Sequence, residues 1–152
     1  QQVGGLGIYV NGIRIDSVIY TDLNDWFVPA NGWTTYCGDS GKDPRSHMTV
    51  TGNTCYMQLE LQRADRKPVT FQSGDYWDIG YFKQGFIPKI GLNVPCIFNN
   101  GLYGGAFVPG NTNPSNTTGI NGDGNYLRGH LRVGVRQTND AWWVSVFMMY
   151  TL

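Results

Sequence analysis

The sequence predicts an all-β protein, a β-sandwich or jelly-roll-like head domain with little or no helix. No segment of ten or more residues has apolar positions at helical spacing. Several segments instead alternate apolar and polar residues with the period of two of a strand, and turns rich in Gly, Pro and Asn separate them. About eight to ten short strands of this kind are typical of a sandwich or jelly roll.

The first half of the chain opens with a hairpin signal. Asn11-Gly12 separates two apolar runs, and this pair best tolerates the two positive φ angles of a type I′ turn, so residues 6–20 are predicted as a β-hairpin. The stretch from Asp22 to Lys42 is rich in Asn, Gly, Thr and Asp, which predicts loops around one short strand at 26–28. Residues 55–63 alternate cleanly, as a strand with one buried face does. A polar turn follows, and extended structure resumes at 69–71.

The second half contains further strands and one long loop. Strands are expected at 77–81, 94–98 and 102–108, with a break at 99–101. Residues 109–125 hold two Pro and four Gly and predict a loop whose length is unusual unless it is functional or disordered. Two long strands follow at 127–136 and 141–152. The last is apolar on both faces, so Trp142 and Trp143 are expected in the core or against a neighbouring subunit.

The composition argues against nucleic-acid binding and membrane insertion and favours neutral polar ligands. Eleven basic residues balance eleven acidic ones, so there is no basic excess for nucleic-acid binding. No run of 18 apolar residues exists, so no transmembrane segment or membrane insertion is expected. Charged residues make up only 14% and aromatic residues another 14%. A surface built from Asn, Thr, Ser, Gly and Tyr suits neutral polar ligands such as sugars, or other protein subunits.

The chain has the size of one domain. Its 152 residues contain no repeat and no linker, so residues 1–152 are predicted as a single β head domain. The start at Gln1, without Met or a signal segment, favours the C-terminal fragment of a longer chain over a cleaved signal. Neither the cysteines nor the two His have metal-site spacing, so no metal or cofactor is expected. Cys55 is expected to be reduced and buried, while a Cys37–Cys96 disulfide stays open as an alternative.

Residues 73–92 read SGDYWDIGYFKQGFIPKIGL, between an alternating strand and a strand, glycine-rich loop and closing hairpin. With the closing segment from Ala141 to Val146, this resembles the C-terminal head domains of phage tail receptor-binding and minor tail proteins. The resemblance covers roughly the last hundred residues. Residues 1–50 carry no family motif, and Phe82-Lys83-Gln84 stands where the family usually has Leu-Pro. The resemblance implies a jelly-roll-like head at the tail tip of the virion. Such a head is extracellular, commonly trimeric, and recognises host cell-surface saccharides.

Sugar sites pair the face of an aromatic ring with planar polar groups. Three groups of residues supply this mixture: Trp33, Tyr36, Asp39 and His47; Asn99, Tyr103, Asp123 and Tyr126; and Arg128, His130 and Arg132. Each group has a structural alternative: core packing under a loop for the first, a connecting loop or subunit contact for the second, and a solvated face or an intersubunit row of ion pairs for the third. If the third group binds a ligand, that ligand carries phosphate or carboxylate.

The predicted function is host recognition by a phage receptor-binding or tail fibre protein, through binding of cell-surface polysaccharide without catalysis. A homotrimer is the expected assembly. A secreted lectin-like carbohydrate-binding domain and a structural virion or tail interaction domain are the alternatives. A glycoside hydrolase is the enzymatic rival, because Asp75, Asp78, Asp123 and Asp140 are available as carboxylate pairs. The sequence contains no Gly-x-Ser-x-Gly elbow and no metal-spaced His pair.

Overall fold

Antiparallel strands are nearly all of the regular secondary structure in the computed structural model, which describes residues 8–112 and 127–152. Within these residues the one helical element is a 3₁₀ turn, η1, at Leu23–Asp25. The all-β prediction is therefore confirmed. The strands are β1 (Tyr9–Val10), β2 (Ile13–Arg14), β3 (Ser17–Tyr20), β4 (Phe27–Pro29), β5 (Trp33–Thr35), β6 (His47–Thr51), β7 (Thr54–Arg63), β8 (Val69–Phe71), β9 (Tyr76–Phe82), β10 (Leu92–Phe98), β11 (Tyr103–Val108), β12 (His130–Gly134), β13 (Asn139–Ala141) and β14 (Trp143–Thr151).

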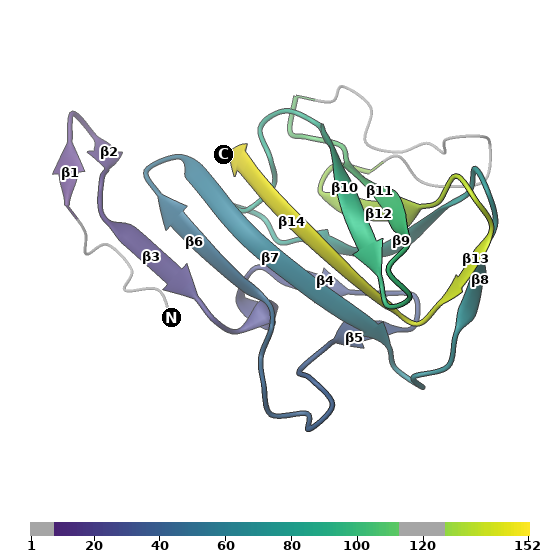
Figure 1. Cartoon of the computed structure of the whole chain (residues 1–152). Coiled ribbons are helices and arrows are strands. Elements are labelled where there is room, and N and C mark those ends of the chain that lie inside the picture. Colours follow the sequence, from purple (N-terminus) through teal and green to yellow (C-terminus); the bar gives the residue numbers. More distant parts are fainter. Residues whose placement is uncertain (1–7, 113–126) are drawn as a thin grey trace.

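Ten of these strands form one strongly curled sheet. Its order is β3–β6–β7–β14–β10–β11–β12–β9–β4, and β5 pairs with β7 beside this path. Because β4 and β5 are consecutive in the chain, the connection at residues 30–32 joins the β9 side of the sheet to its β7 side. The sheet thus bends round on itself into a sandwich-like fold (Figure 1), and the small sheet of β8 and β13 lies at one end.

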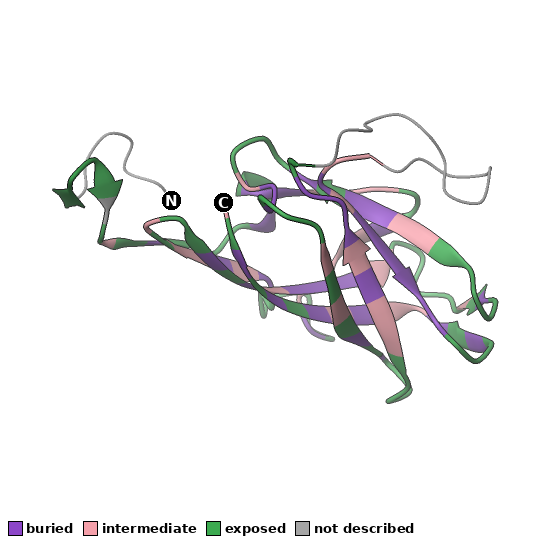
Figure 2. Ribbon diagram, turned by 90° about the horizontal axis from the view of Figure 1, so that it is seen from above, coloured by how far each residue is buried: buried purple, intermediate pink, exposed green. Residues whose placement is uncertain are grey.

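The core fills the inside of this curl. Alternate residues of β7 and β14 are buried, and the register places them opposite one another, as Leu59 opposite Val146. Trp26, Phe27 and Phe82 pack together with ring centroids 5.2 to 6.1 Å apart. Full burial of a side chain of this size contributes about 1.5–3 kcal/mol. In Figure 2 the buried segments follow the central strands, and the connections are mostly exposed.

The N-terminal hairpin has the predicted turn. Asn11 and Gly12 have φ angles of 52° and 77°, as a type I′ turn requires. The hairpin is shorter than expected, because β3 does not belong to it and instead pairs with β6 at the edge of the large sheet. Residues 8–15, named the arm from here on, project from the end of β3 away from the body (Figure 1). Residues 6 and 7 of the predicted hairpin lie outside the described residues.

Three strands were not expected from the sequence pattern: β5, β6 and β13. Each is five residues or shorter. Both β5 and β13 pair with strands distant in the sequence, while β6 lies between the distant β3 and β7, which follows it across a two-residue turn. Such strands carry too few residues for a clear alternation, since strand preference depends on the pairing context. The predicted turn at 137–140 is therefore partly a strand that pairs with β8.

The two tryptophans of the last strand are not in the core. Val144, Val146 and Met148 face inward, so Trp143 points to the outer face, and both Trp142 and Trp143 are half-buried. The expectation that they are core residues is wrong: Trp143 stands beside the inward-facing Val144, and Trp142 lies just before β14 begins. Their alternative place, in an interface, stays a prediction.

All three cysteines are free thiols. Cys55 and Cys96 are 0% and 2% exposed, as expected for Cys55 as a small buried hydrophobic residue. Burial raises the pKa of Cys55 to about 11 and that of Cys96 to about 12. Cys37 is half-buried, 3.9 Å from the Thr35 hydroxyl.

Candidate functional site

Trp33, predicted as a ligand-binding aromatic residue, is a core residue. Its side chain is 4% exposed, and its ring lies 6.1 Å from Phe71 and 6.3 Å from Trp77, measured between ring centroids. The Arg63 guanidinium carbon lies 5.4 Å from the Trp33 ring centroid. Pairing of β5 with β7 draws Trp33 inward, so no face of its ring is open to a sugar.

Tyr36 and Asp39 lie together on the surface but bind each other. The Tyr36 hydroxyl donates to Asp39 Oδ1 at 3.3 Å, and Arg66 forms an ion pair with the same oxygen at 3.1 Å. Burial, and next the Asp39 charge, raise the pKa of the Tyr36 phenol. Arg45 lies 5.7 Å from the centroid of the Tyr36 ring. A ligand would have to displace these contacts, so this group is a poor open site.

Other candidates are dispersed. His47 lies on β6, with its ring centroid 6.4 Å from that of Tyr56, whereas Trp33 is in the core. Asn99 has a structural contact, because its Oδ1 accepts a hydrogen bond from the backbone nitrogen of Trp142 at 3.0 Å. Two candidates lie outside the described residues: Asp123 and Tyr126.

The basic group near β12 is partly paired. His130 Nδ1 lies 2.6 Å from Asp78 Oδ2 on β9, and the His130 ring stacks on Tyr81 at 5.1 Å. Arg128 is half-buried, and Arg132 is only 6% exposed. The expected solvated row of three basic side chains is therefore wrong: β12 is covered enough to bury Arg132, and Asp78 partners His130.

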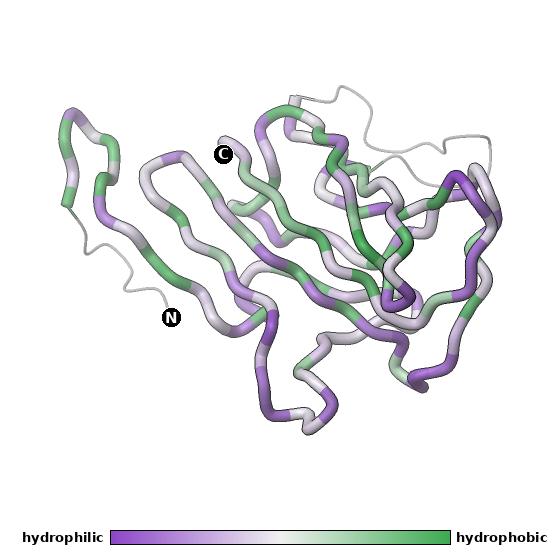
Figure 3. The backbone as a smooth tube through the Cα atoms, in the orientation of Figure 1, coloured by the Kyte–Doolittle hydropathy of each residue, from purple (hydrophilic) through white to green (hydrophobic). Residues whose placement is uncertain are grey.

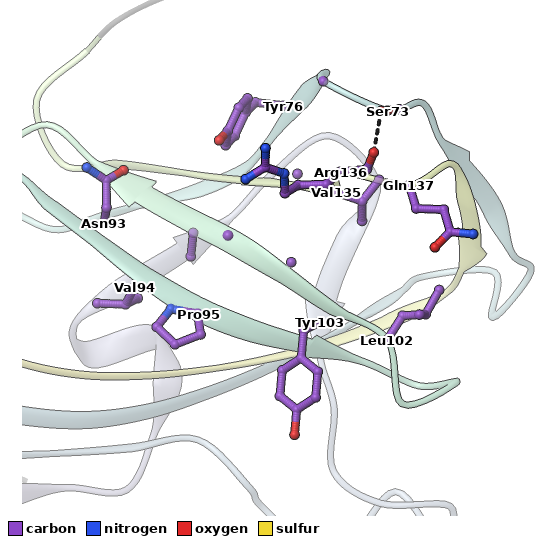
Figure 4. Close-up of a pocket in the computed structure, with 15 residues that line it drawn as sticks. Ser73, Tyr76, Asn93, Val94, Pro95, Leu102, Tyr103, Val135, Arg136 and Gln137 are labelled. Carbon is purple, nitrogen blue, oxygen red and sulfur yellow. Dashed lines mark hydrogen bonds between the residues drawn. The ribbon is translucent and has the colours of Figure 1, made fainter.

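Tyr103 lies at a surface hollow of about 880 Å³ over the outer faces of β10, β11 and β12. Among the predicted candidates that the structure describes, it alone lines this hollow. Five polar side chains at its margin are Tyr76, Asn93, Tyr103, Arg136 and Gln137; a sixth, Ser73, donates its hydroxyl proton to the Arg136 carbonyl. In Figure 4, Tyr76 and Arg136 lie on one side of the hollow, and Pro95 and Tyr103 lie on the other.

Glycines form the floor of the hollow. Gly105 of β11 pairs with Gly134 of β12. The Tyr76 ring covers Gly134, since a Cβ there would lie 3.0 Å from the ring. At Gly105 the floor is open: the atom nearest to an added Cβ would be the Tyr76 hydroxyl oxygen, 4.0 Å away. The missing side chains create the depression on a sheet face that outward side chains would otherwise fill.

Apart from Ser73, the polar side chains around the hollow are not engaged elsewhere in the described residues. Within the described residues, the side chains of Tyr76, Asn93, Tyr103, Arg136 and Gln137 form no hydrogen bond or ion pair. In the first and third candidate groups, Asp39 is paired with Arg66 and His130 is paired with Asp78. A ligand in the hollow therefore replaces only water, and gains hydrogen bonds without breaking internal ones.

The lining offers aromatic rings, amides and one cation, which are groups that bind a ligand. Arg136 is the only charged side chain among the residues that line the hollow. No carboxylate lines it, so it lacks the facing pair that a glycosidase uses. In the part of the chain that the structure describes, no three His, Cys, Asp or Glu side chains are grouped to hold a metal ion.

Sequence reasoning missed four margin residues: Tyr76, Asn93, Arg136 and Gln137. One signal pointed to their location, namely Gly104-Gly105 and Gly134 inside predicted strands. Glycine in a strand interior often marks close approach of another backbone or a ligand. The signal was not sufficient, because the hollow forms only when β10, β11 and β12 lie side by side.

Comparison with models of known protein families, with curated proteins and with solved structures finds no match to this chain. Nor do the described residues include a helix that has both the length and the apolar character needed to cross a bilayer.

Proposed function

We propose that this chain is the host-recognition domain of a phage receptor-binding or tail fibre protein, and that it binds a cell-surface saccharide without catalysis. The observation that carries the sugar-binding part is the hollow with open tyrosine, amide and guanidinium groups over a glycine floor. The phage assignment, the virion location and the homotrimer rest on the resemblance of residues 73–92 to phage tail heads.

The hollow has the dimensions and the lining that a short saccharide needs. Its volume of about 880 Å³ lies within the usual range of ligand sites. Tyr76 and Tyr103 are 47% and 71% exposed, so their rings can stack on the apolar C–H face of a pyranose. Asn93 and Gln137 each offer an amide donor and acceptor that match the hydroxyls of a sugar.

Arg136 specifies the charge of the ligand. As the only charged residue in the lining, it favours a saccharide that carries a carboxylate or phosphate, which a guanidinium binds with two parallel hydrogen bonds. Sequence reasoning expected an anionic ligand at the basic group of β12 instead. The hollow is the better place for it, because Arg136 has no partner among the described residues whereas His130 is paired with Asp78.

A glycan array, read out for binding and for released reducing ends, tests the proposal. Wild type should bind acidic or phosphorylated glycans and release no product. Gly105→Val should abolish binding, because the new side chain occupies the open floor. Arg136→Gln should weaken binding about tenfold or more, since a hydrogen bond to a charged group contributes about 1.5–3 kcal/mol. Tyr76→Ala should also weaken it.

Tyr81→Ala is the matched control. It removes a similarly exposed tyrosine from the same strand, but Tyr81 lies beside His130 and outside the hollow. If Tyr81→Ala alone loses binding, the site is the His130 group. Released oligosaccharide would assign a hydrolase, and absence of any glycan binding would favour the structural tail domain. Binding that depends on the hollow in a secreted, virion-free protein would favour the lectin-like alternative.

A further inference from the structure

The arm carries an aliphatic surface that its own molecule leaves exposed. Its two strands pair Val10 with Ile13, and the Ile15 nitrogen donates to the Ile8 carbonyl at 2.7 Å. Since side chains alternate along a strand, these four residues share one face of the hairpin, and Tyr9 lies on the other. Their side chains are 49% to 62% exposed.

An isolated two-stranded hairpin in water is marginally stable, and a hydrophobic face needs a surface to pack on. The described contacts of β1 are chiefly with β2, and the arm stands away from the sheet in both views (Figures 1 and 2). The aliphatic face of the arm therefore lacks the packing surface that a stable hairpin needs. A partner surface that buries it would supply the missing packing.

A second apolar surface of matching character lies on the outer face of β10 and β14. It is a hollow of about 410 Å³ with Ile97, Tyr103, Phe147 and Met149 in its lining, and no lining residue is charged. These four side chains are 39% to 71% exposed. Phe147 is fixed by an edge contact with Tyr56 at 4.9 Å. Figure 3 shows hydrophobic segments both in the arm and along β10 and β14.

The arm cannot bury its whole face in the hollow of its own chain. Ile15 is two residues from Ser17, which pairs with Thr51 in the sheet, so it lies within about 7 Å of β3. The nearer strand of the hollow, β14, is three strands away from β3, about 14 Å at 4.8 Å per strand, and β10 lies one strand further. The base of the arm stays out of reach as long as β3 is paired with β6.

We propose that the arm of one copy docks its aliphatic face into the hollow over β10 and β14 of a second copy. A second copy is the occupant that supplies a fitting partner for both surfaces at once, because each chain carries one arm and one uncharged apolar hollow. Each surface consists of only a few side chains. The area buried by a single contact is therefore small compared with the roughly 800 Å² per partner of a stable interface.

Assembly with closed symmetry increases that area. Arm and hollow are different surfaces, so repeated docking in one direction forms a ring when the rotation between copies closes, while two copies that exchange arms form a closed pair. Either arrangement gives each chain two such contacts. Tyr103 and Pro95 line both this hollow and the glycine-floored one, so a docked arm would form one wall of the proposed saccharide site. The docking itself does not depend on sugar binding.

Sedimentation velocity and light scattering on the whole chain test the docking. Wild type at about 10–100 µM should have a mass of at least twice that of the 16.9 kDa monomer. Val10→Lys on the arm and Met149→Glu in the hollow should each raise the dissociation constant tenfold or more, since each places an unpaired charge in an apolar contact. Both side chains are more than half exposed, so the monomer should keep its fold by circular dichroism.

Two further variants decide specificity. Tyr9→Lys adds the same charge on the opposite face of the arm and should leave the mass unchanged. Combining Val10→Lys with Met149→Glu should recover assembly in part, because the two charges then meet across the contact. A monomeric wild type, assembly that survives Val10→Lys, or a loss with Val10→Lys but not with Met149→Glu would overturn the proposal. Co-sedimentation of a monomer with phosphatidylcholine vesicles would assign the arm to a lipid surface instead.

Discussion

Gly104 and Gly105 are neighbours in β11, yet alanine at the two positions should have opposite effects on stability. An added Cβ at Gly105 points into the hollow, where the nearest atom is 4.0 Å away. An added Cβ at Gly104 points inward, 2.7 Å from the Phe98 ring and closer still to the carbonyl oxygen of Gly134. Neither glycine has a positive φ, so backbone conformation does not distinguish them.

The magnitudes follow from these contacts. Glycine in a strand interior costs about 0.5–1 kcal/mol relative to alanine, so Gly105→Ala should stabilise by up to that amount. At Gly104 the obstacle is backbone of the paired strand, which cannot rotate away. Overpacking of this kind costs about 1–3 kcal/mol, so Gly104→Ala should be destabilising by that order. For a chain of this size, 1 kcal/mol shifts the melting temperature by about 2–4 °C.

Urea unfolding monitored by tryptophan fluorescence, with calorimetry of the same samples, measures both variants. Gly105→Ala should shift the melting temperature upward by about 1–4 °C and Gly104→Ala downward by about 2–12 °C. Equal shifts for the two variants would refute the assigned directions of the two side chains, and with them the glycine floor. Loss of 1 kcal/mol or more with Gly105→Ala would show that the hollow is filled in the folded protein.

Two further predictions concern buried titratable groups. A maleimide at pH 8 should label Cys37 alone in the folded protein and all three cysteines in urea, because burial raises the pKa of Cys55 to about 11 and of Cys96 to about 12. Rapid native labelling of a second thiol would contradict the burial. Burial also raises the pKa of Glu60, so the folded state holds this proton more tightly and loses stability as pH rises above about 4.3. Glu60→Gln removes this loss, and its stability relative to wild type should increase from about pH 4 to pH 7. A difference in unfolding free energy that stays constant with pH would refute the raised pKa.

Part of the candidate site was accessible from the sequence and most was not. Tyr103 could be predicted because it stands close to the break at 99–101, and binding residues tend to lie on the loops of a rigid sheet. Trp33 looked equivalent, since it too stands in a Gly- and Asn-rich stretch. Its burial depends on β5 pairing with β7, about thirty residues further along the chain. Local composition contains no information on that pairing.

What the sequence alone determined is the local geometry. The alternation in β7 assigns its inner and outer faces, and Asn11-Gly12 determines the hairpin turn, because both depend on residues that are adjacent in the chain. Only the tertiary structure decided the order of the strands, the burial of Trp33 and the hollow where Tyr76, Tyr103 and Arg136 converge. These features arise from contacts between β9, β10, β11 and the end of β12, whose pairing reflects the packing of the whole sheet. A period-two pattern says which face of a strand is buried, but not which strand lies beside it.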